Sequence, residues 1–145
     1  MIVGKCLCGD VEFVCDLERD PLKIYQCHCS LCKKQTGSSA NSATIISATN
    51  FKWTHKESIK NWQKDTGYNS HFCGNCGSPV PNLFAKKYYW IPVGLLELNN
   101  DKDFVKVAGD FCLSAKSSWH KTNEDSAKFE KSPNLETILT LLETS

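Results

Sequence analysis

The chain has 145 residues, with 17 lysines and arginines against 16 acidic residues and a formal net charge of +1. This length predicts a single domain over residues 1–145. The balanced charge argues against a nucleic-acid partner or a membrane surface, and no apolar run approaches the roughly 18 residues of a membrane span. Nine cysteines with no secretory signal before the first of them favour a reduced, cytoplasmic setting over a disulfide scaffold.

In the first half of the chain, short apolar segments alternate with polar residues or are rich in β-branched side chains, which favours strands. The predicted strands cover residues 11–16, 22–25, 43–46, 51–53, 59–62 and 70–72. Between the second and the third, the polar residues 33–39 predict a turn or a single helical turn that ends at Gly37.

In the second half, residues 88–95 form the most apolar segment and predict a central strand, in which Pro92 marks an edge or a bulge. Late strands are predicted over residues 104–107 and 109–113. An amphipathic helix is predicted over residues 134–143, with Asn134 as its N-cap. Many short strands and few helices together predict a mainly β domain.

The cysteines are the most informative feature, because seven of the nine form three tight clusters: Cys6 and Cys8; Cys27, Cys29 and Cys32; Cys73 and Cys76. A Cys-x-Cys pair is too short for an unstrained disulfide loop. In an extended segment, however, residues two apart point to the same side and can reach one cation. The Cys-Gly-Asn-Cys-Gly run has the spacing of a zinc knuckle, whose glycines allow a tight turn. The clusters therefore predict zinc binding.

Seven thiolates divide naturally into four and three, because structural zinc sites are closed by four ligands and catalytic sites keep three. The two distant pairs would form the closed site and the triplet the open one. In an alternative, the triplet recruits His28 or His71 and both sites are structural. Iron in place of zinc, or reversible oxidation of some pairs, is a further alternative, because spacing does not choose among metals that prefer sulfur.

Other cysteines and histidines receive structural interpretations. Cys15 and Cys112 lie outside the clusters on apolar strands, where a free cysteine usually acts as a small buried hydrophobic residue. In an extended segment His28 would point away from the metal, which favours packing or support of the ligands. Surface or packing roles are expected for the remaining histidines, His55, His71 and His120.

Three motifs around the clusters resemble those of a known family. They are GKCLCGDVEF at residues 4–13, CHCSLCKKQTGS at 27–38 and FCGNCGS at 72–78, with weaker motifs at 93–96 and at Lys116-x2-Trp119. In this order and spacing they resemble the glutathione-dependent formaldehyde-activating enzymes, also called the CENP-V/GFA domain. The resemblance covers residues 4 to about 133, and the C-terminal helix lies outside it.

The resemblance implies a β-tent fold, mainly β, with small antiparallel sheets around zinc. It implies two zinc ions per chain and the same division of ligands: Cys6, Cys8, Cys73 and Cys76 for the structural zinc, and Cys27, Cys29 and Cys32 for the catalytic zinc. The implied activity is the condensation of formaldehyde with glutathione to S-(hydroxymethyl)glutathione, a carbon–sulfur lyase reaction.

Zinc with three thiolates carries a net negative charge, which weakens it as a Lewis acid and favours thiol exchange over water activation. We therefore expect a substrate thiol such as glutathione near an aldehyde. Lys33 and Lys34 are candidates for binding a glutathione carboxylate, and Trp119 for lining the pocket. The rival hypotheses are a non-catalytic zinc module that binds a protein partner, and a carrier of thiol adducts.

Overall fold

The computed structural model describes residues 1–17, 21–99 and 105–144. Its helices are α1 (Ser30–Thr36) and α2 (Leu135–Leu142), and short 3₁₀ turns occupy Ala48–Asn50, Val93–Leu95 and Leu113–Ala115. The strands are β1 (Ile2–Lys5), β2 (Glu12–Cys15), β3 (Leu22–Cys27), β4 (Asn41–Ser47), β5 (Phe51–His55), β6 (Ile59–Gln63), β7 (Asn69–Cys73), β8 (Asn82–Phe84), β9 (Tyr88–Pro92), β10 (Val105–Phe111) and β11 (Ala127–Lys128).

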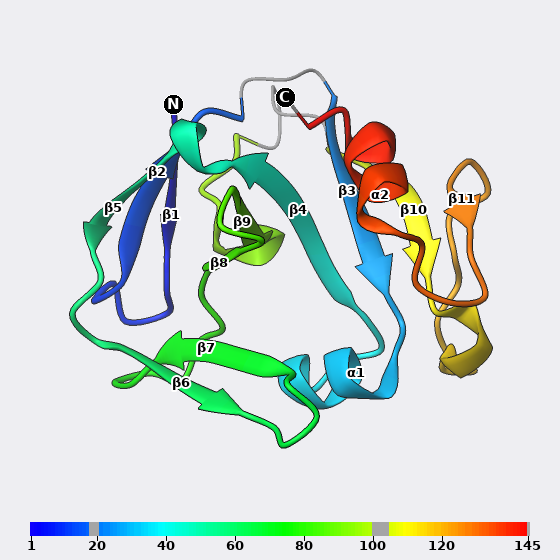
Figure 1. Cartoon of the computed structure of the whole chain (residues 1–145), viewed down its shortest axis with the longest axis horizontal. Coiled ribbons are helices and arrows are strands. Elements are labelled where there is room, and N and C mark those ends of the chain that lie inside the picture. The colour runs from blue at the N-terminus through cyan, green and yellow to red at the C-terminus, as the bar shows by residue number, and fades with distance from the viewer. Residues whose placement is uncertain (18–20, 100–104, 145) are drawn as a thin grey trace.

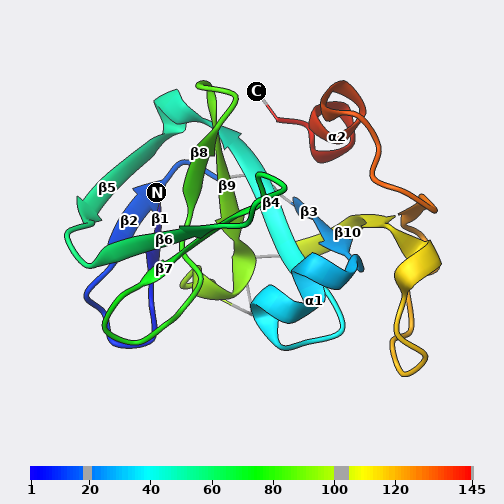
Figure 2. The same cartoon turned by 60° about the horizontal axis from the view of Figure 1, so that its bottom comes forward.

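The strands form three small sheets. A three-stranded sheet has the order β1-β2-β5, a six-stranded sheet the order β11-β10-β3-β4-β9-β8, and β6 and β7 form a hairpin. In Figure 1 the three-stranded sheet and β3–β4 lie on opposite sides, with the β6–β7 hairpin and α1 along the bottom. Figure 2 shows α2 on the side of β3 and β10, away from the three-stranded sheet.

The predicted mainly β fold of small sheets with a short C-terminal helix is confirmed. One difference is that the largest sheet is mixed, because β10 runs parallel to β3 and to β11. β3 and β10 are far apart in the sequence, so no hairpin turn forces them to be antiparallel.

The late part of the chain differs from the prediction in detail. The two strands expected over 104–107 and 109–113 are one strand, β10, whose register with β3 shifts between Val107 and Gly109. An irregularity of this kind breaks the alternation, so the sequence pattern looks like a strand boundary. Residue 104 lies outside the described residues.

The central strand predicted over 88–95 ends at Pro92, and Val93–Leu95 form a 3₁₀ turn. β9 lies between β4 and β8 in the six-stranded sheet, but β8 pairs with it only as far as Trp90. Pro92, the last residue of the strand, is paired on one side alone, opposite Ala43, so it stands at a local edge as expected. Proline has no backbone N–H to donate, but because β9 ends at Pro92, this interrupts no later pairing.

The main core lies between the three-stranded and six-stranded sheets and includes the fully buried Phe13, Ile46 and Ile91. The Phe13 ring stacks on Phe51 with centroids 5.2 Å apart. Gly4 on the neighbouring strand leaves room for this ring, since a Cβ there would lie 2.1 Å from it. Among the described residues, none of the helices is both long and apolar enough to cross a membrane.

Both helices follow local signals. The Asn134 side chain accepts a hydrogen bond from the Thr137 N–H at 2.8 Å, as predicted for the N-cap of α2. α1 ends at Gly37, whose φ of +66° suits a residue without a side chain. It begins at Ser30, earlier than the turn predicted over residues 33–39, because the Cys29 sulfur caps it.

Candidate metal centres and the adjoining pocket

Four cysteines from remote parts of the chain come together in the fold. The sulfurs of Cys6, Cys8, Cys73 and Cys76 all lie within 4.8 Å of one another. Cys8 Sγ is 3.7 Å from Cys6 Sγ and 3.8 Å from Cys73 Sγ. A tetrahedral zinc site with Zn–S bonds of about 2.3 Å has edges of roughly 3.8 Å. The donor set and its spacing therefore fit one such ion.

A tight turn after β1 and another after β7 position these sulfurs. Gly9 and Gly77 have φ values of +87° and +81°, which glycine adopts without strain. The Val11 N–H donates to Cys6 Sγ at 3.3 Å. Ser78 joins the two segments, because its hydroxyl accepts from the Leu7 N–H at 3.0 Å and lies 3.3 Å from Cys76 Sγ.

The thiols of this group differ in acidity. Hydrogen bonds from the Ser78 hydroxyl and N–H lower the pKa of Cys76 to about 5. Burial raises the pKa of Cys73 to about 11. Metal binding to a thiol requires the thiolate, so Cys76 is prepared for coordination while Cys73 depends on the cation to lose its proton.

The second thiol group comes from one short segment. Cys27 ends β3, Cys29 caps α1 and Cys32 lies in the first turn of that helix, and their sulfurs lie within 4.8 Å of one another. The Cys32 N–H donates to Cys29 Sγ at 3.3 Å. A strand that runs directly into a helix therefore turns all three sulfurs toward one point.

Two thiols of the triplet, those of Cys27 and Cys29, resist ionisation in the absence of a cation. The neighbouring Cys32 thiol, with burial, raises the pKa of Cys27 well above its usual range. Burial also raises the pKa of Cys29. Crowded thiols of this kind fit a soft cation that neutralises their charge, so these residues could hold a metal ion.

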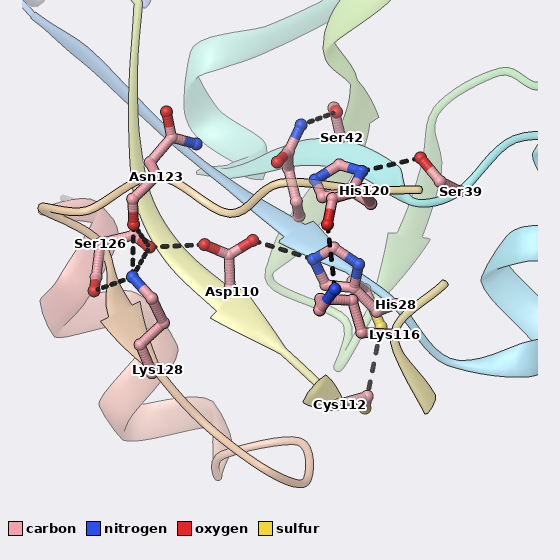
Figure 3. A network of polar contacts seen from close by, with 12 residues as sticks. His28, Ser39, Ser42, Asp110, Cys112, Lys116, His120, Asn123, Ser126 and Lys128 are labelled. Carbon is pink, nitrogen blue, oxygen red and sulfur yellow. Dashed lines mark hydrogen bonds and ion pairs between the residues drawn. The ribbon is translucent and has the colours of Figure 1, made fainter. Parts of the chain in front are cut away.

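Behind the triplet lies a buried polar network, which Figure 3 shows from close by. His28 and Asp110 are fully buried, and their side chains meet with His28 Nε2 2.9 Å from Asp110 Oδ1. The backbone N–H of His28 donates to the backbone carbonyl of Phe111 at 2.9 Å. His28 does not join the thiol group, which agrees with its predicted supporting role. It fixes the loop between Cys27 and Cys29 to β10.

The network continues on both sides of this pair. The Ser126 hydroxyl donates to the other oxygen of Asp110. The His120 ring packs edge-on against His28 with centroids 4.6 Å apart, and His120 Nδ1 lies 2.7 Å from the Ser39 hydroxyl. His28, Asp110 and His120 form a third group of potential ligands. His28 Nε2, both Asp110 oxygens and His120 Nδ1 have hydrogen-bond partners, whereas His28 Nδ1 is buried without one among the described residues. Through the contact between His28 and Asp110, this network anchors the segment from Cys27 to Cys29 to β10.

The cysteines outside the clusters behave differently from each other. Cys15 is fully buried, and burial raises its thiol pKa to about 12, as expected for a small hydrophobic residue. The same prediction for Cys112 is wrong. Cys112 follows β10 with a left-handed φ of +60°, is partly exposed, and lies with its sulfur 3.9 Å from Cys27 Sγ. The apolar residues up to Phe111 predicted a strand that continues to residue 113, so no sequence signal marked the turn at Cys112.

A pocket of about 450 Å³ is lined in part by Cys27 and Cys32 of the triplet. It lies over β3, β4, β8 and β9, between α1, the turn joining β6 to β7, and α2. Its lining is mostly aromatic, aliphatic or amide-bearing and comprises Tyr25, Cys27, Cys32, Gln35, Asn41, Ile45, Gly67, Tyr68, Asn69, Asn82, Phe84, Trp90, Phe111, Ser132, Leu135 and Ile138. Clefts of about this volume bind small molecules.

Two tyrosines stand in this lining. The Tyr25 ring stacks on Phe111 at 4.6 Å, and its hydroxyl accepts from Trp90 Nε1 at 2.8 Å. The Tyr68 hydroxyl donates to the Gln35 side-chain oxygen. Burial raises the pKa of both phenols, so both remain protonated near neutral pH. Sequence reasoning missed them because their neighbours come from β9, β10 and α1, which no local motif connects.

The candidate substrate-binding residues from the sequence lie elsewhere. Lys33 extends its ammonium group to the Ala115 carbonyl, 2.8 Å away. Lys34 is exposed on α1, and Trp119 is 74% exposed. None of the three belongs to the pocket lining. Charged and aromatic residues near a motif are weak signals, because a helix turns successive side chains in different directions.

Comparison with known proteins identifies the family of this chain and a related fold. Residues 1–114 match the model of the family described as glutathione-dependent formaldehyde-activating enzyme. A crystal structure of a Rhodobacter sphaeroides protein from structural genomics superposes with a TM-score of 0.54 and 22% identity. It covers 71% of this chain and 97% of its own, which shows a shared fold. No curated protein matches the chain.

The family match includes both thiol groups and most of the strands that position them. The chain therefore belongs to the glutathione-dependent formaldehyde-activating enzyme family.

Proposed function

We propose that this single-domain protein is a carbon–sulfur lyase that condenses a thiol such as glutathione with formaldehyde or a related small aldehyde. In this reaction the thiol sulfur bonds to the carbonyl carbon, the S–H proton is released, and the carbonyl oxygen takes up a proton to become a hydroxyl. The observation that carries the proposal is the pocket whose lining includes Cys27 and Cys32 of the triplet. The chemistry named by the family description supports it.

Two zinc ions per chain belong to this proposal. Cys6, Cys8, Cys73 and Cys76 would hold a structural ion, and the triplet would hold a catalytic ion. When bound, the catalytic zinc lowers the pKa of a substrate thiol and so supplies a thiolate near neutral pH. Seven cysteines must remain reduced for this, which supports a reducing compartment such as the cytoplasm.

Tyr25 is the residue best placed to assist the aldehyde. Its hydroxyl oxygen accepts from Trp90, so its own proton is available to a group in the pocket, and stacking on Phe111 fixes the ring. Negative charge develops on the carbonyl oxygen as the carbon–sulfur bond forms. A positioned hydroxyl donor stabilises that charge.

The experiment is exchange NMR of formaldehyde and glutathione in the presence of the protein. Wild type accelerates exchange above the buffer rate, and Cys29→Ser returns it to that rate while the protein stays folded. Cys15→Ser, at a thiol remote from the pocket, is the control for general effects of cysteine loss. Wild-type exchange at the buffer rate would reject catalysis and favour a zinc module that binds a protein partner or carries thiol adducts.

A second variant tests the role of Tyr25. Removal of one donor to a developing oxyanion commonly costs about 100-fold in rate. We therefore expect Tyr25→Phe to lose most of the catalysed exchange with zinc content unchanged. Tyr88→Phe, outside the pocket lining, is the matched control. Equal rates for the two variants would remove Tyr25 from the mechanism.

A further inference from the structure

The pocket beside the triplet carries no formally charged side chain among the described residues that line it. Its polar groups are neutral: the carboxamides of Gln35, Asn41, Asn69 and Asn82, together with hydroxyls. Glutathione brings two carboxylates and one ammonium group. A carboxylate that enters such a pocket loses water without gaining a cationic partner, which is costly.

Two ammonium groups near the triplet have partners elsewhere. Lys33 donates to the Ala115 carbonyl at 2.8 Å, and Lys116 donates to the carbonyls of Ser117 and His120 at 3.2 and 2.9 Å. Lys64 lies in the same turn as Tyr68 but outside the lining. Lys33 and Lys116 are therefore engaged outside the pocket, and Lys64 is not one of its lining residues.

The triplet itself would repel an anion. Under the function proposed above, three thiolates around one divalent cation leave a net negative charge at the reacting end of the pocket. Like charges in a site of reduced dielectric repel one another strongly. The electrostatics of the reacting end and of the walls therefore act in the same direction, against an acidic substrate.

The walls instead match an uncharged molecule. The stacked pair Tyr25 and Phe111, with Trp90 and Phe84, offers apolar surface, and the carboxamides offer both donors and acceptors for amide groups. Such a lining, mostly apolar with a few neutral polar groups, selects a ligand by shape and hydrogen bonding.

We propose that the thiol substrate of this protein is an uncharged, amide-bearing thiol with apolar surface, in place of the acidic tripeptide glutathione. This inference rests on the proposed function, because it assigns the substrate class of the same site. It places the amide groups against the carboxamides and the thiol end at Cys27 and Cys32.

The first test compares thiols in the exchange measurement. Pantetheine, an uncharged thiol with two amides, is expected to exceed glutathione in kcat/KM by at least about tenfold, given the cost of an unpaired buried charge. Glutathione diethyl ester keeps the skeleton but masks both carboxylates, and it is expected to react faster than glutathione. Glutathione as good as or better than both would overturn the inference and leave the proposed function standing.

The second test changes the pocket. Asn69 is exposed at the rim, so it tolerates a longer side chain. Asn69→Lys is expected to raise the ratio of glutathione to pantetheine activity severalfold, and the neutral variant Asn69→Gln, which keeps the carboxamide, is expected to raise it less. An unchanged ratio in the lysine variant, with the protein folded, would contradict an electrostatic basis for selection.

Binding gives a readout that does not depend on catalysis. S-methylpantetheine and S-methylglutathione have no free thiol, and we expect only the former to shift the Trp90 indole N–H signal at sub-millimolar concentration. If no thiol reacts above the buffer rate but S-methylpantetheine still binds, the charge selection is supported and the proposed activity fails. Equal shifts by both analogues would overturn the selection.

Discussion

At the scale of single residues, Gly4 shows how one missing side chain shapes the core. A Cβ at this position would lie 2.1 Å from the fully buried Phe13 ring, which is also packed against Phe51 and Trp53. The ring has little space to move, so an added methyl group must shift a strand. Gly4 therefore matters for packing, although it lies at the start of a cysteine motif.

We expect Gly4→Ala to lower the free energy of unfolding by about 2 kcal/mol, the usual cost of overpacking a core. Urea unfolding of the zinc-loaded protein measures the change. Gly94→Ala is the control, because a Cβ at Gly94 meets nothing within 4 Å. Equal stability of the two variants would show that the Phe13 ring relaxes freely.

His120 gives the protein a specific pH dependence. Burial, with the neighbouring His28, lowers the pKa of His120. In the unfolded chain a histidine has a pKa of about 6.5, so near pH 6 the unfolded state binds more protons than the folded state. Stability is therefore unaffected by this group well above pH 6.5, and it falls as the pH drops through that value.

The measurement compares unfolding free energies of wild type and His120→Gln between pH 7.5 and 5.5. The difference between their pH curves isolates His120 from proton competition at the thiols, which both proteins share. We expect the variant to lose less stability on acidification. His55→Gln, at an exposed histidine, should follow wild type. A His120→Gln curve parallel to wild type would contradict this account.

The residues that bring thiols together could be predicted from the sequence, whereas their surroundings could not. Cys27, Cys29 and Cys32 are adjacent in the chain, so spacing alone brings them near each other. The Asp110 partner of His28, the Cys112 sulfur beside Cys27 and the Tyr25–Trp90 contact depend on strand pairing over long distances. Sequence patterns of short range contain no such information.

At the scale of secondary-structure elements, the signals that worked were local. The N-cap at Asn134 and the end of α1 at Gly37 depend only on neighbouring residues. The direction of β10 depends on which strands become its neighbours, so the antiparallel expectation failed for β10, which runs parallel to β3 and β11.

The cap of α2 is expected to contribute about 1 kcal/mol. α2 is short and packs on β3, β4 and β10, and its residues Leu135 and Ile138 line the pocket. Asn134→Ala should therefore lower the unfolding free energy by about that amount, while Asn134→Asp, which keeps an acceptor oxygen, should retain it. Calorimetry of both variants measures this, and an alanine variant as stable as the aspartate variant would show that the cap is dispensable.

At the scale of the whole molecule, the four-thiol group connects the loop after β1 to the end of β7. This connection closes a long stretch of chain that includes β2 to β6, α1 and the triplet. A metal that closes it would stabilise the folded state relative to the unfolded chain, because it joins segments that are remote in sequence. The triplet closes only a short segment, so its ion can be lost with little change in the fold.

The central claim is that seven thiols divide into a closed group of four and an open group of three. Native mass spectrometry of zinc-loaded protein tests it most directly, with circular dichroism to monitor folding. The account predicts two zinc ions in wild type and in Cys112→Ser, one in a folded Cys29→Ser, and loss of folded protein in Cys73→Ser. A single zinc ion in wild type at saturating zinc, or two ions retained by Cys29→Ser, would contradict it.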